Sequence, residues 1–127
     1  MSLTQIFLAI GAVLAGIAVA GGAFAAHALR DYLSDRSLVI FETGIRYQMY
    51  HALALLLVAV LVNRAELPPL SLTIAGYAFI AGIAIFSGSL YVLSLSGIKW
   101  LGAITPLGGV AFILGWACLA IAAFNYE

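Results

Sequence analysis

Residues 41–62, FETGIRYQMYHALALLLVAVLV, join the most polar stretch of a presumed helix to an uninterrupted apolar run. The first half, Phe41–His51, carries Glu42, Arg46 and two tyrosines, whereas Ala52–Val62 has only apolar side chains. Ionisable groups are costly inside a bilayer and are tolerated near its surface. The stretch therefore predicts a membrane-embedded helix with a polar cluster near one membrane face.

The composition of the 127-residue chain indicates the same class of protein. Hydrophobic residues make up 65% of the chain and charged residues only 8%, far below the roughly 25% charged residues of soluble domains. Lipid must therefore cover most of the surface. Five basic and five acidic residues give a net charge of zero, so we predict membrane lipid as a partner and no nucleic acid.

Four apolar segments are long enough to cross a bilayer, which takes about 20 residues. We predict spans over residues 4–27, 39–63, 69–95 and 100–124. The first has no basic residue before it and is longer than the apolar region of a signal peptide, so we expect it to be retained. The expected fold is a single all-α domain, a polytopic four-transmembrane-helix bundle with short loops.

The first loop has an amphipathic pattern. Leu29, Tyr32 and Leu33 share one face of a possible helix, which predicts a short amphipathic helix lying at the membrane interface. Either Ser34 or Ser37 could cap the helix that follows.

Basic residues are unevenly distributed between the two sides of the predicted bundle. The first and third loops share a side, and the basic residues on that side are Arg30, Arg36, Arg46 and Lys99. The opposite side holds only Arg64. Because cytoplasmic loops carry the excess of Lys and Arg, we predict a protein of the cell (inner) membrane with both termini outside.

The polar side chains that could form a site gather toward the first-loop side. These candidates are His27, Glu42, Arg46, Tyr47, Tyr50, His51, Ser87, Ser89, Tyr91 and Thr105. The opposite half is nearly bare, since Leu55–Val62 is wholly apolar. The pattern predicts either a polar pocket near the cytoplasmic face, suited to a lipid or small ligand, or a structural hydrogen-bond network.

Three of these candidates allow more than one interpretation. Glu42 and Arg46 lie one helical turn apart and can pair, or Arg46 can bind a ligand anion or lipid phosphate. His51 can form a structural hydrogen bond to a neighbouring helix or titrate and bind a ligand. Together with His27 and Glu42 it could in principle ligate a metal, but no His-x-x-x-His or Glu-x-x-His spacing supports this. We predict no metal and no cofactor.

Small residues repeat at every fourth position of the first span, in the series Ala12, Gly16, Ala20 and Ala18, Gly22, Ala26. Such series let helices approach closely, either within one chain or in a homo-oligomer. The segments Ser87-Gly88-Ser89 and Gly108-Gly109 are expected to be further close-packing points.

Several motifs together resemble a known family. They are GAFAAHAL (22–29), TG (43–44) with YQMYHALAL (47–55), FSGSLY (86–91) and ITPLGG (104–109). This set is similar to the YgdD and transmembrane-protein-256 family of small four-span membrane proteins. The resemblance covers nearly the whole chain and implies a polytopic inner-membrane protein of uncharacterised function. It implies no catalytic residues.

The residues favour a non-enzymatic membrane protein that binds a lipid or small ligand, or that serves as a structural subunit. The alternative is a small-solute or proton transporter or channel formed by an oligomer, although the bare outer half argues against a path through one subunit. No Ser-His or metal spacing indicates an enzyme, and Cys118 is far from both histidines in depth.

Overall fold

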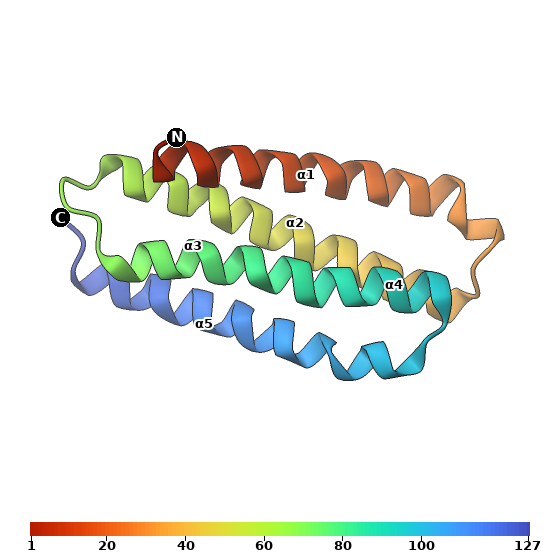
Figure 1. Cartoon of the computed structure of the whole chain (residues 1–127). Helices are drawn as coiled ribbons and strands as arrows, with labels where there is room; N and C mark the ends of the chain where they lie inside the picture. Colours follow the sequence, from red (N-terminus) through yellow and green to blue (C-terminus); the bar gives the residue numbers. More distant parts are fainter.

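Four long helical segments pack side by side, as Figure 1 shows. The computed structural model describes every residue from Met1 to Glu127. Its elements are α1 (Leu3–His27), the 3-10 turn η1 (Leu29–Asp31), α2 (Asp35–Arg64), α3 (Leu70–Gly82), the π-helical turn η2 (Ile83–Ser87), α4 (Gly88–Ser96), the 3-10 turn η3 (Lys99–Ala103) and α5 (Thr105–Phe124). Because α3, η2 and α4 are continuous, the four candidate spans are Leu3–His27, Asp35–Arg64, Leu70–Ser96 and Lys99–Phe124. The predicted all-α, four-span fold is confirmed.

The connections divide the bundle into two ends. The α1–α2 and α4–α5 connections lie together at one end, whereas both termini and the α2–α3 connection lie at the other (Figure 1). The first end carries Arg30, Arg36 and Lys99 and is called the basic end. The other end, with Arg64 and the termini, is called the terminal end.

The starts and stops of the helices follow from local chemistry. Ser2 caps α1 in a reciprocal pair with Gln5, each side chain bonding the other residue's backbone N–H. The Ser34 hydroxyl accepts a hydrogen bond from the Ser37 N–H at 3.1 Å and so begins α2. Gly97 ends α4 with a φ of +73°, a left-handed conformation that glycine adopts without strain.

The predicted amphipathic helix in the first loop is wrong. Because Ser34 already caps α2 at Asp35, the loop is too short for more than the single 3-10 turn η1. The residues of the expected apolar face also differ in their exposure. Leu29 is only 8% exposed, whereas Tyr32 is 85% exposed. The second helix therefore starts before residue 39, and its first turn extends beyond the predicted span.

Glycines set the closest contacts between α3 and α5. Phe112 of α5 lies over Gly82 of α3, and Phe79 of α3 lies over Gly115 of α5, so each helix supplies an aromatic ring and a glycine. Gly108 of α5 lies directly against the Phe86 backbone. Such contacts replace the missing hydrophobic driving force between helices in lipid.

Of the predicted close-packing glycines, Gly108 is confirmed, but a Cβ at either Gly88 or Gly109 would meet nothing within 4 Å. The two small-residue series of α1 also differ. Ala18 is buried and Gly22 faces Ile45 of α2, whereas the series with Gly16 is exposed and nothing lies within 4 Å of a Cβ placed there.

Apolar and polar side chains occupy different halves of the interior. An apolar cluster of 13 buried residues, which includes Phe7, Leu55, Leu72 and Phe79, fills the half toward the terminal end. Of the buried polar residues, Gln48, Ser87, Ser89 and Ser94 lie in the half toward the basic end, whereas His51 lies at the middle of α2. The predicted asymmetry of the polar side chains is thus present in the fold.

Candidate functional site

Gln48 joins three helices from a position that is 3% exposed. It lies on α2, and its Nε2 donates a hydrogen bond to the Leu14 carbonyl of α1 at 2.8 Å. Its Oε1 accepts a hydrogen bond from the Tyr91 hydroxyl of α4 at 2.6 Å. The approach is possible because Gly44, one turn earlier on α2, has no side chain: a Cβ there would lie 2.7 Å from the Tyr91 ring.

Two serines of the third span bond its neighbours on either side. Ser87 is the last residue of the π-helical turn η2, and its hydroxyl donates a hydrogen bond to the Gly44 carbonyl of α2 at 2.7 Å. The Ser89 hydroxyl donates to the Phe86 carbonyl at 2.9 Å and lies 2.6 Å from the Thr105 hydroxyl of α5. The Thr105 hydroxyl also lies 3.4 Å from the Leu101 carbonyl, so either hydroxyl can donate in the bond between Ser89 and Thr105.

His51 connects α2 to α5. Its Nδ1 lies 2.7 Å from the Tyr47 carbonyl, and its Nε2 lies 3.0 Å from the indole nitrogen of Trp116. A carbonyl can only accept and an indole N–H can only donate, so both bonds are satisfied by the neutral ring with its proton on Nδ1. The ring also stacks on Phe112, with centroids 3.5 Å apart and planes at 10°.

The bonds between helices link all four spans, and α2, the third span and α5 are linked in a ring. We call this set of bonds the closed network. Of the ten candidates, His51, Ser87, Ser89, Tyr91 and Thr105 are buried or half-buried, and each bonds another part of the bundle. Donors and acceptors that are already satisfied within the protein leave little free bonding capacity for a ligand. The arrangement fits the structural interpretation of these five residues.

The other five candidates lie on the outside of the bundle. They are His27, Glu42, Arg46, Tyr47 and Tyr50. No three of the chain's His, Cys, Asp and Glu side chains come together in a metal-binding group, and none of the ten candidates lines any of the three pockets. None of these pockets therefore brings His27, Glu42 and His51 to a common space. Binding of a ligand by any of the exposed residues stays a prediction.

The expected pairing of Glu42 with Arg46 is also absent. No basic group of the chain lies within 4.0 Å of a carboxylate, and both side chains are exposed. Two long exposed side chains lose conformational freedom when they pair, and their attraction in a polar medium is weak. The alternative interpretation, in which Arg46 extends toward the membrane surface, fits this geometry better.

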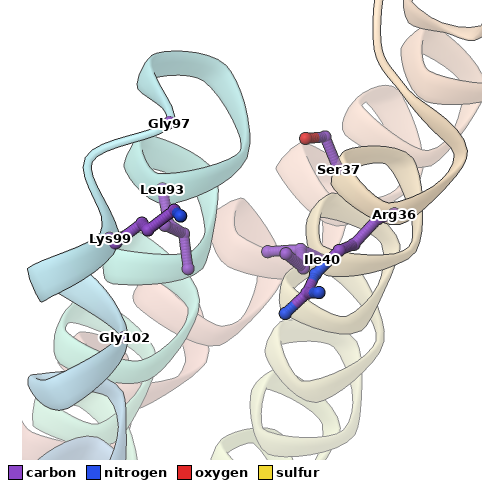
Figure 2. A pocket seen from close by; sticks show the side chains of 7 residues that line it. All are labelled: Arg36, Ser37, Ile40, Leu93, Gly97, Lys99 and Gly102. Atoms are coloured by element: carbon purple, nitrogen blue, oxygen red, sulfur yellow. The ribbon is translucent and has the colours of Figure 1, made fainter.

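The largest pocket lies at the basic end, outside the hydrogen-bond network. It has a volume of about 590 Å³, whereas the other two measure about 340 and 310 Å³ and adjoin the apolar half. One wall is the start of α2, with Arg36, Ser37 and Ile40. The other is the end of α4 and the start of η3, with Leu93 and Lys99. Figure 2 shows the charged ends of Arg36 and Lys99 directed into the space between these walls.

Four residues of this region were not among the predicted site residues: Gln48, Trp116, Arg36 and Lys99. Gln48 was one polar residue among many, and only the fold places it between α1 and α4. Trp116 carried a usable signal, because a tryptophan far from the membrane interface needs a partner for its indole N–H. Arg36 and Lys99 entered only as counts for orientation, since nothing in their spacing of 63 positions (99 minus 36) predicts a shared pocket.

The four apolar spans and their short connections define a polytopic membrane protein built as a four-helix bundle. A family model described as "Protein of unknown function (DUF423)" matches residues 21–109. The chain belongs to this family. The predicted membership of a family of small, uncharacterised membrane proteins is thus confirmed, under a different family name.

Relatives match along nearly their whole length. The UPF0382 membrane protein YwdK of Bacillus subtilis (strain 168) is 48% identical over 122 residues, which cover 96% of this chain and 98% of the relative. The UPF0382 membrane protein SAB0533 of Staphylococcus aureus (strain bovine RF122 / ET3-1) is 47% identical over the same shares. No solved structure matches the chain.

Proposed function

We propose that the chain is a non-enzymatic membrane protein that binds a lipid or small amphiphile at its basic end. The observation that carries this proposal is the pocket of about 590 Å³ between α2 and the α4–η3 connection. Its volume falls within the range of small-molecule sites, and it lies where a bundle of this length meets the lipid headgroups. The closed network beneath it holds the helices that form its two walls.

The chemistry of the buried polar groups supports a binding role over catalysis. Both nitrogens of His51 are already engaged, by the Tyr47 carbonyl and by Trp116. The Ser87 hydroxyl bonds a backbone carbonyl, and Cys118 lies within the apolar cluster. A nucleophile needs a base within hydrogen-bond reach, and these residues are not arranged in that way.

Transport through one subunit has weaker support. A polar path from the basic end to the terminal end would have to cross the cluster of 13 buried apolar residues. Transporters place polar or broken-helix features near the middle of the membrane. Here the polar pair at that depth, His51 and Trp116, is bonded to itself and to the Tyr47 carbonyl. A pore between several copies would need a separate interface.

The proposed orientation places the basic end in the cytoplasm, in the cell membrane, with both termini outside. It is supported by Arg30, Arg36 and Lys99 at that end, compared with Arg64 at the other.

A second copy of the chain is the proposed protein partner, through the exposed small-residue face of α1 around Gly16. Gly16→Leu should then reduce cross-linking between copies without unfolding the monomer.

Native mass spectrometry tests the binding function. The full chain is extracted from membranes in a mild detergent and measured intact. We expect a fraction of the protein to carry one bound lipid or amphiphile, which is lost as the detergent becomes harsher. Protein that carries no such adduct, even in the mildest detergent that keeps it folded, would contradict the proposal.

A further inference from the structure

The pocket at the basic end has an unbalanced charge. Two of the residues that line it, Arg36 and Lys99, are basic, and none is acidic. They come from different elements, α2 and η3, that only the fold brings together. Figure 2 shows both charged ends directed into the same space, with the Ser37 hydroxyl near its rim.

No carboxylate of the chain compensates these two charges. Asp35 precedes Arg36, yet neither forms an ion pair within 4.0 Å. Arg36 also lies in the first turn of α2, where the helix dipole disfavours a cation and favours an acidic residue. Neither cation is therefore explained by helix stability or by pairing, and two like charges that face one space favour an anion between them.

The pocket changes from polar to apolar toward the membrane interior. Ile40 lies one helical turn beyond Arg36 along α2, about 6 Å deeper at the standard rise. Leu93 lies one turn before Gly97, on the membrane side of the opposite wall. Both apolar residues line the same pocket as the two cations. This order matches a phospholipid, whose phosphate lies above its glycerol and acyl chains.

We propose that Arg36 and Lys99 bind the phosphate of an anionic phospholipid headgroup, while Ile40 and Leu93 contact the apolar part of the same molecule. The proposal rests on the binding function proposed above and names its ligand class. Arg binds phosphate with several fixed N–H donors and Lys binds it as a point charge. The same chemistry would also hold a soluble phosphate, which lacks the apolar part.

The test uses the delipidated full chain in detergent, titrated with lipid and followed by native mass spectrometry. Dioleoyl phosphatidylglycerol is compared with dioleoylglycerol, which has the same acyl chains and no phosphate. The variants are Arg36→Gln, Lys99→Gln and the double variant R36Q/K99Q. The matched control is R30Q/R64Q, which removes the same amount of charge outside the pocket.

We expect each single variant to weaken phosphatidylglycerol binding about fivefold and the double variant about 25-fold. Binding to the control variant should change less than twofold, and dioleoylglycerol should bind all proteins alike. Arg36→Lys keeps the charge and should retain most of the affinity. Since the two wild-type side chains make no hydrogen bond or ion pair, thermal unfolding of the variants should match that of the wild type.

Inorganic phosphate separates the two possible sources of the anion. If millimolar phosphate displaces phosphatidylglycerol from the wild type, with the same dependence on Arg36 and Lys99, the phosphate chemistry is supported and a soluble ligand is its source. If phosphatidylglycerol binds the double variant as tightly as the wild type, the inference is overturned while the binding function stands. Absence of any bound lipid, native or added, contradicts the binding function itself.

Discussion

Single glycines decide how closely the helices of this bundle approach one another. The motif at residues 108–109 contains two glycines that look equivalent in the sequence, yet only Gly108 faces another helix. A Cβ at Gly108 would lie within 3.0 Å of Phe86 backbone atoms, which cannot move aside as a flexible side chain could. A Cβ at Gly109 would meet nothing within 4 Å.

Gly108→Ala should therefore destabilise the protein by about 1–3 kcal/mol, because α5 must move away from the third span. Gly109→Ala is the matched control and should change the free energy of unfolding by less than about 0.5 kcal/mol. Thermal unfolding in detergent measures both. Equal effects of the two substitutions would contradict the packing described between α5 and Phe86.

Gln48 and Tyr91 form the second residue-scale feature with a measurable consequence. Gln48→Leu leaves the Tyr91 hydroxyl without its acceptor, and Tyr91→Phe leaves the Gln48 carbonyl oxygen without its donor. Each substitution lowers the free energy of unfolding, because a buried polar group loses its hydrogen-bond partner. The double variant should cost less than the sum of the two, with a coupling energy of about 0.5–2 kcal/mol.

Tyr77→Phe is the control for this cycle, since Tyr77 is 50% exposed and makes no hydrogen bond with Gln48. Gln48→Leu combined with Tyr77→Phe should be additive. A coupling of the same size in the control pair would show that the Gln48–Tyr91 bond is not the cause.

At the scale of elements, α2 (Asp35–Arg64) carries most of the connections. It packs along α1, contacts the third span through Ser87 and Tyr91, and reaches α5 through His51. Its first turn also forms one wall of the basic pocket. In the third span, the π-helical turn η2 makes the connection to α2. It adds a residue to one helical turn and ends at Ser87, whose hydroxyl bonds α2.

Ser34 decides where α2 begins, so Ser34→Ala should weaken the first turn. We expect a loss of about 0.5–2 kcal/mol in stability and faster hydrogen exchange at the first backbone amides of the helix, including that of Ser37. Ser34→Asp should retain the cap, because its carboxylate can accept the same hydrogen bond and also suits the helix dipole. Protection at Ser37 that survives Ser34→Ala would exclude the cap as the start signal.

At the scale of the whole molecule, the division into a polar half and an apolar half sets what the protein can do. Hydrogen bonds between the middle of the bundle and the basic end give the helices a defined arrangement and support the pocket above them. Close packing of apolar side chains fills the half toward the terminal end. A binding site at one membrane surface suits this division better than a path between two aqueous phases.

The proposed orientation gives a whole-molecule prediction. A reporter fused after Glu127 should give a periplasmic signal, active alkaline phosphatase or dark green fluorescent protein. A reporter inserted in the first loop near Tyr32 should give the cytoplasmic signal, since the loop is exposed and tolerates insertion better than a helix. A fluorescent C-terminal fusion would reverse the orientation and place the basic pocket outside.

The sequence by itself determined the class of protein, the number of spans and the half in which polar groups gather. These follow from local properties, since about 20 apolar residues must cross a bilayer as a helix whatever they pack against. A serine cap at the start of the second helix was predictable for the same reason, although the choice between Ser34 and Ser37 came from the structure.

Only the tertiary structure decided which polar residues are bonded internally and which face a pocket. A helix shows side chains on every side, and small differences in rotation determine whether a residue faces a neighbour or lipid. His51 thus meets Trp116 rather than Glu42 or His27. Arg36 and Lys99 line the same pocket because the first and third connections close the same end of the bundle, a proximity that no local pattern encodes.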